Sequence, residues 1–170
     1  MTIETAARPN PRLGAYMQYV SDEGIDLDRF VEHGGRLLGR EDSASLMSEL
    51  KGLREIIGIL RREYPLFGRQ IEFLARFFES DAATYSEQVR NETAFALLYA
   101  VKDMDMMPDH MPGVGYLDDA AVVKVLFSRH AEVFERHCAV NGIEWAALTE
   151  TAAAPPRLSA SPHRISSKPA

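Results

Sequence analysis

Residues 43–65, SASLMSELKGLREIIGILRREYP, decide the fold class of this chain. Their apolar side chains recur at spacings of three and four, which places them on one face of an α-helix. These side chains are Leu46, Leu50, Leu53, Ile57, Leu60 and Tyr64. Ser43 stands where an N-cap is expected, and Pro65 stops the helix because proline cannot continue its hydrogen bonding. The stretch therefore predicts one long amphipathic helix.

The same periodicity continues on both sides of this helix, and no convincing strand alternation interrupts it. A second helix is predicted from Pro65 to a break at Ser80 and Asp81, and a third over residues 84–102. A fourth is predicted over residues 118–141, where Gly142 supplies the C-terminal cap. Shorter candidates cover residues 12–20 and 27–38. The pattern predicts an all-α fold, a compact bundle of five or six helices joined by short connections.

Composition divides the 170 residues into a body and a tail. Residues 151–170 hold four prolines, four serines, three basic side chains and no acid, which predicts a disordered, basic, Pro/Ser-rich tail. Residues 1–150 are predicted to form a single helical domain, which is large enough to be stable without a disulfide or a metal. Cys138 is the only cysteine, which excludes a disulfide scaffold and favours a reducing compartment. We therefore expect a soluble protein of the cytoplasm.

The charge of the chain argues against nucleic-acid binding, and the length of its apolar runs argues against a transmembrane segment. The net charge is −6, and residues 1–150 hold 16 Lys and Arg against 25 Asp and Glu. Because affinity for phosphates comes chiefly from cationic side chains, nucleic-acid binding by the folded part is disfavoured. The longest apolar run, residues 94–101, is far shorter than the ~20 residues that cross a bilayer. We expect no transmembrane segment.

The most specific stretch is residues 103–119, DMDMMPDHMPGVGYLDD, between the last two long predicted helices. Its prolines fix φ and its glycines allow positive φ, so it predicts a Pro/Gly/Asp-rich helical hairpin turn. We expect Asp118 to cap the following helix and Asp119 to lie in its first turn. The proposed structural motif is Asp105, Pro108, Asp109, Pro112, Gly115, Asp118 and Asp119.

On these residues the chain resembles the YkvA-like family, a small bacterial domain of unknown function. Tyr99 and the seven motif residues fall on the family signature in register, and residues 120–127 continue it as an apolar helix. The resemblance covers about residues 92–130. Asp103 stands where the signature has a proline, and methionines replace its usual isoleucines and leucines. The resemblance implies no particular activity. In many relatives the domain accompanies hydrophobic segments, so the resemblance implies an association with membranes, which for this chain would be a peripheral membrane contact.

Three interpretations of the aspartates are open. In the favoured one, they cap helices and accept turn amides. In the second, a magnesium or calcium ion binds among Asp105, Asp109, Asp118 and Asp119, because hard cations prefer carboxylate oxygens. In the third, such an ion activates water for hydrolysis. The third is the weakest, because the chain shows no phosphate loop, nucleophile elbow or metal-binding histidine pair.

The remaining candidate residues are interpreted as structural. His130 and His137 are separated by about 10.5 Å of helical rise, so they do not chelate one ion, and we expect core or interface histidines. Cys138 is expected to be a small buried apolar residue. For the methionine-rich stretch, core filling or an adaptable contact surface is favoured over soft copper ligation, and the candidate interaction surface is Met106, Met107, His110 and Met111.

The sequence thus predicts a non-enzymatic interaction or scaffold module without a cofactor, for an unidentified protein or membrane-bound partner. The alternative is a divalent-cation-binding protein or a metal-dependent hydrolase that uses the aspartate cluster.

Overall fold

The computed structural model describes residues 22–38, 40–80, 84–101 and 116–149. Within these ranges it has six α-helices, one short 3₁₀ helix and no strand, which confirms the predicted all-α bundle. The elements are α2 (Leu27–Leu37), α3 (Arg40–Glu63), α4 (Pro65–Glu79), α5 (Glu87–Val101), α6 (Leu117–Arg129), α7 (Ala131–Asn141) and η2 (Trp145–Ala147). The predicted helix over 12–20 and the predicted tail over 151–170 lie outside the described residues.

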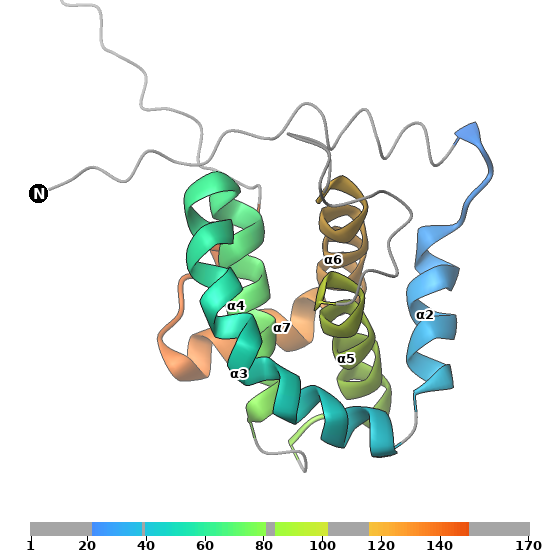
Figure 1. Ribbon diagram of the computed structural model, residues 1–170, viewed down its shortest axis with the longest axis horizontal. Helices are drawn as coiled ribbons and strands as arrows, with labels where there is room; N and C mark the ends of the chain where they lie inside the picture. The colour runs from blue at the N-terminus through green and yellow to red at the C-terminus, as the bar shows by residue number, and fades with distance from the viewer. Residues whose placement is uncertain (1–21, 39, 81–83, 102–115, 150–170) are drawn as a thin grey trace, which may run out of the picture.

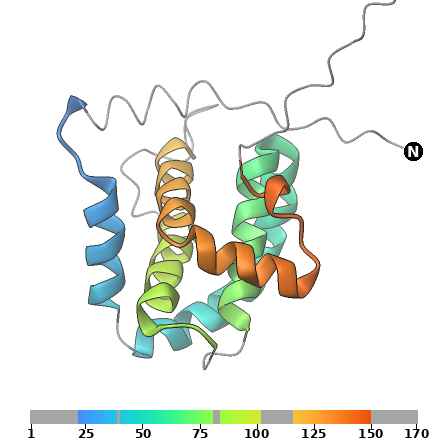
Figure 2. The same cartoon turned by 180° about the vertical axis from the view of Figure 1, so that it is seen from behind.

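Helices α5 and α6 occupy the middle of the bundle, between α2 on one side and the pair α3 and α4 on the other (Figure 1). Helix α2 packs on α5 and α6, whereas α3 packs on α4 and α5. Figure 2 shows the same bundle from behind, where α7 leaves the end of α6 and crosses toward α4. The element η2 then folds back against α4, to which its backbone is hydrogen bonded through Arg69 and Gln70.

The main core is a cluster of buried apolar side chains that draws on α2 to α7, and a second, small cluster joins Leu27 of α2 to Leu117 and Ala121 of α6. The centre of the main core is aromatic: Phe77 of α4 and Phe134 of α7 are both 0% exposed, and their rings meet edge to face with centroids 4.9 Å apart. Full burial of one such side chain contributes about 1.5–3 kcal/mol. Five of the six apolar side chains predicted for this helix are buried on α3, namely Leu46, Leu50, Leu53, Ile57 and Leu60, whereas Tyr64 follows the last residue of α3 and is half-buried.

Helix boundaries follow the sequence signals in part. Pro65 is the first residue of α4 and Ser80 follows its last, as predicted. Helix α3 begins at Arg40, so Ser43 lies inside it and the predicted N-cap is wrong. Helix α5 begins later than predicted, because the Ser86 hydroxyl accepts a hydrogen bond from the N–H of Val89 (3.4 Å) and caps the helix there.

The predicted continuous helix over residues 118–141 is divided at His130 into α6 and α7, so that prediction is wrong. Neither proline nor glycine lies at the break. The hydroxyl of Ser128 donates to the carbonyl of Lys124 (3.1 Å), a bond that bends helices. Gly142 adopts φ 65° after α7, which confirms the predicted C-terminal cap.

Candidate functional site

The described part of the motif consists of Tyr99 on α5 and the chain from Tyr116 onward, at the start of α6. Nothing is described between residues 101 and 116. The remaining motif positions and the candidate contact residues therefore lie outside the described residues: Asp105, Pro108, Asp109, Pro112, Gly115, Met106, Met107, His110 and Met111.

Asp118 and Asp119 occupy the first turn of α6, where their charge interacts favourably with the helix dipole. Asp119 lies there as predicted. The capping position predicted for Asp118 is wrong, because the helix already begins at Leu117 and the residue before it is Tyr116. Both carboxylates are buried, with exposed fractions of 0% for Asp118 and 1% for Asp119. They belong to the interior of the protein and not to its surface.

The partner of Asp118 is Tyr99, whose hydroxyl donates a hydrogen bond to Oδ2 at 3.0 Å. This bond joins α5 to α6 across the segment that the structure does not describe. Burying a carboxylate is costly unless it is hydrogen bonded, so the tyrosine offsets part of that cost. The ring of Tyr99 is itself held edge to face against Phe30 of α2, with centroids 5.7 Å apart. Three helices therefore fix the geometry of this carboxylate.

A second polar cluster links α2, α5 and the α6–α7 break, and we refer to Asp28, Glu92, Arg129 and His130 as the Glu92 cluster. Arg129 donates two hydrogen bonds to the Glu92 carboxylate, at 2.9 and 3.1 Å, in a bidentate arrangement. His130 Nε2 lies 2.7 Å from the same carboxylate, and Gln88 donates to it at 3.0 Å. Arg129 also donates to Asp28 on α2. Four bonds thus saturate the acceptor positions of one buried carboxylate.

The electrostatics of this cluster favour the charged forms of both main partners. Burial alone raises the pKa of Glu92, but the hydrogen bonds from Arg129, Gln88 and His130 outweigh it and leave the pKa below its ordinary value. The hydrogen bond to Glu92 raises the pKa of Arg129 despite the opposing effect of burial. A carboxylate that is ionised and fully bonded is well suited to joining helices and poorly suited to transferring a proton.

Sequence reasoning missed the Glu92 cluster. Glu92 precedes a long apolar run in α5. An acidic residue at a core-facing position of a helix indicates a buried carboxylate that needs a partner, and this signal could have identified Glu92 from the sequence. Its partner Arg129 lies 37 residues away in the sequence, and Asp28 lies 101 residues from Arg129. No local spacing relates such residues, so only the fold brings them together.

His137 and Cys138 are core residues, as predicted. The Tyr85 hydroxyl lies 2.5 Å from Nδ1 of His137, and burial lowers the pKa of this histidine. Cys138 is 0% exposed, and burial raises the pKa of its thiol to about 11, with a further contribution from Glu135. A thiol with that pKa is not a nucleophile at neutral pH. His130 is likewise a satisfied histidine, and its partner is Glu92.

Two features are absent from the described residues: a group of metal-binding side chains and a membrane-spanning helix. Within those ranges, no three His, Cys, Asp or Glu side chains gather in a way that could hold a metal ion. In the same part of the chain, no helix combines the length and apolar character that a membrane span requires.

Comparison with known families identifies a segment that runs from Glu92 on α5 to Val125 on α6. Residues 92–125 match a family model described as a protein of unknown function, DUF1232. The match confirms the resemblance predicted from the motif. It begins at Glu92 and includes Tyr99, Asp118 and Asp119, so it contains the bond between Tyr99 and Asp118 but only the carboxylate of the Glu92 cluster, whose other members lie outside it. No curated protein and no solved structure matches the chain.

Proposed function

We propose that this chain is a cytoplasmic, non-enzymatic interaction module in which the aspartate-rich turn presents a contact surface to another protein. The burial of Asp118 carries the proposal, because this carboxylate is 0% exposed and accepts a hydrogen bond from Tyr99. A carboxylate in that position stabilises the junction between α5 and α6. The module comprises residues 1–150, and residues 151–170 form a basic tail.

The ionised, fully hydrogen-bonded state of Glu92 also supports a role of the buried carboxylates in the fold and not in catalysis. Its four hydrogen bonds join α5 to Arg129 at the end of α6 and to His130, and its lowered pKa keeps it ionised. The contact itself is assigned to Met106, Met107, His110 and Met111. Methionine suits such a surface because its flexible, polarizable side chain adapts to partners of different shape.

A photo-crosslinking amino acid at position 107 of the full chain tests this proposal. The matched control carries the same group in place of Val140, an apolar residue that is 80% exposed on α7. In cells, we expect position 107 to give one adduct of fixed mass that position 140 does not give. The captured protein, once purified, should bind the unmodified chain and lose at least about tenfold in affinity toward a Met106→Glu, Met111→Glu variant.

Three results would contradict the proposal. The first is the absence of any adduct specific to position 107. The second is crosslinking of position 107 to lipid together with flotation of the chain on vesicles that contain anionic phospholipid, which would indicate a membrane surface as the partner. The third is magnesium- or calcium-dependent hydrolysis of a phosphoester by the purified chain, which would indicate an enzyme.

A further inference from the structure

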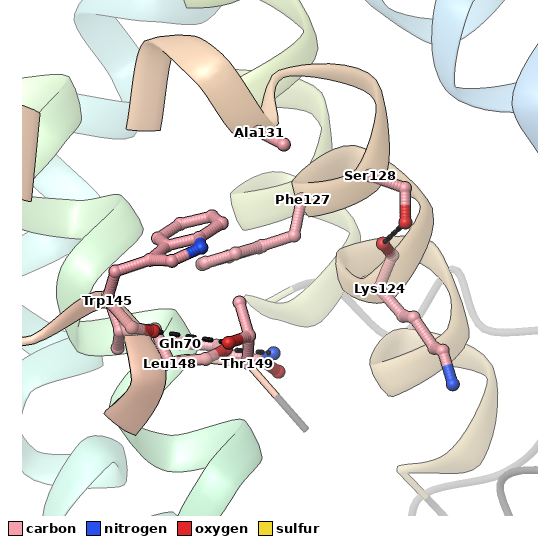
Figure 3. A pocket seen from close by; sticks show the side chains of 8 residues that line it. All are labelled: Gln70, Lys124, Phe127, Ser128, Ala131, Trp145, Leu148 and Thr149. Carbon is pink, nitrogen blue, oxygen red and sulfur yellow. Dashed lines mark hydrogen bonds between the residues drawn. The ribbon is translucent and has the colours of Figure 1, made fainter. Parts of the chain in front are cut away.

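A pocket of about 250 Å³ lies between α4, α6, the first residue of α7 and the chain around η2. Figure 3 shows its lining at close range. The rings of Trp145 and Phe127 form one wall, and Lys124 and Ser128 of α6 lie on the other side. The lining is completed by Gln70, Ala131, Leu148 and Thr149, so the pocket combines an aromatic wall with both polar and aliphatic groups.

The pocket is held open by contacts among its own lining residues. The rings of Phe127 and Trp145 are stacked, with centroids 5.8 Å apart and planes inclined by 18°. Gln70 Nε2 donates a hydrogen bond to the carbonyl of Leu148 (2.9 Å), and the Thr149 hydroxyl donates to the carbonyl of Trp145 (3.3 Å). The Gln70 bond fixes the chain around η2 against α4, and the Thr149 bond is local to that chain. A ligand therefore meets a preformed site and pays little for ordering it.

The charge of the lining selects among ligands. Lys124 is the only charged residue among the eight that line the pocket, and none of the eight is acidic, although the chain as a whole has a net charge of −6. The Lys124 side chain extends along α6 and carries its ammonium group away from the ring pair (Figure 3). The pocket thus has an aromatic end and a cationic end, so it suits a ligand with a ring at one end and an anion at the other.

We propose that this pocket binds a small aromatic carboxylate, with the ring against Trp145 and Phe127 and the carboxylate toward Lys124. Pockets for drug-sized ligands have volumes of roughly 300–1,000 Å³, so this smaller volume limits the ligand to one ring with a short acidic side chain. The proposal is independent of the interaction module proposed above. The two sites share no residue, and the loss of one would leave the other intact.

Trp145 is the only tryptophan of the chain, so its indole N–H gives one assigned signal in the NMR spectrum of the ¹⁵N-labelled full-length protein. The probe is phenylacetate, with phenylacetamide as its uncharged counterpart and acetate as the ringless one. The Lys124→Gln variant removes the cation, and Arg136→Gln is the control, because Arg136 is exposed on α7 and does not line the pocket.

Phenylacetate is expected to shift the indole signal to saturation, with an affinity that falls about fivefold in Lys124→Gln and is unchanged in Arg136→Gln. Phenylacetamide should bind both the unmodified chain and Lys124→Gln with that lower affinity, and acetate should leave the signal in place. If Lys124→Gln does not fold, the comparison of phenylacetate with phenylacetamide on the unmodified chain tests the same point.

The proposal is overturned by either of two results. One is the absence of a saturable shift with phenylacetate up to about 10 mM. The other is equal affinity for the acid and the amide, which would show that Lys124 does not recognise the ligand.

Discussion

Glu92 is a buried carboxylate in a helix whose following residues are mostly apolar, and its surroundings provide one donor for each acceptor position. Arg129 contributes two of these donors and is only 15% exposed in its side chain. Removing one partner of such a pair leaves the other charge in a poorly solvated position, which costs more than the pair itself contributes. The arrangement makes this residue sensitive to conservative replacement.

The Glu92→Gln variant should therefore be less stable than the unmodified chain by roughly 2–3 kcal/mol, because the amide has nearly the shape of the carboxylate but no charge to balance Arg129. Urea denaturation measures the difference. The control is Glu55→Gln on the exposed side of α3, which should change the free energy of unfolding by less than about 0.5 kcal/mol. Equal effects of the two substitutions would show that the Glu92 cluster adds nothing specific.

Acid should remove the contribution of Glu92 to the free energy of unfolding. The pKa of this carboxyl is lower in the folded state than its ordinary value of 4.5, so the folded protein binds fewer protons than the unfolded chain below that value. Its contribution is complete above the ordinary pKa and is lost as the pH falls through the lowered one. The stability difference between the unmodified chain and Glu92→Gln should shrink accordingly in a series of urea titrations. His137 titrates in both proteins and cancels. A difference that stays constant with pH would contradict the assignment.

Among the elements, α2 and α5 approach each other unusually closely where Gly35 faces Glu92. A Cβ atom at position 35 would lie 2.7 Å from Cγ of Glu92 and 3.0 Å from its backbone nitrogen. Side chains rotate out of such a contact, but backbone does not. Glycine at this position is therefore required by the packing of two helices, although it lowers the intrinsic stability of α2.

The Gly35→Ala variant should destabilise the protein by about 1–3 kcal/mol, because the added methyl group forces α2 away from α5. Gly58→Ala on α3 is the matched control, since nothing lies within 4 Å of the position that its Cβ would take. That substitution should stabilise the protein by up to about 1 kcal/mol through helix propensity alone. Thermal or urea unfolding of the two variants should change in opposite directions. A gain in stability for Gly35→Ala would contradict the close packing.

Element prediction from the sequence succeeds where the signal is local. The repeat of leucines in α3, Pro65 at the start of α4 and Gly142 after α7 each specify their own helix or boundary. The break at His130 was missed because the apolar periodicity continues through it. Besides the local bond of Ser128 to Lys124, contacts distant in the sequence hold this break, since Arg129 and His130 both bond to Glu92 on another helix.

At the scale of the whole molecule, the fold class and the family segment were predictable, and the polar sites were predictable only in part. Asp118 and Asp119 were identified from the motif, but their burial depends on where α5 and α2 lie relative to α6. The bond from Tyr99 to Asp118 joins residues 19 positions apart and links α5 to the first turn of α6, a contact that we refer to as the α5–α6 corner. This corner belongs to the matched family segment, and its internal bonding is the basis of the proposed non-enzymatic role.

Thermal unfolding of the full chain and of Asp118→Asn, each with a chelator and with magnesium or calcium, tests that role most directly. If the carboxylate serves the fold, the ions leave both midpoints in place. The substitution then lowers the midpoint equally in each condition, by about 2–4 °C for each kcal/mol of lost stability. A midpoint of the unmodified chain that rises with the ions, and a rise that disappears in Asp118→Asn, would instead show that this aspartate binds a cation.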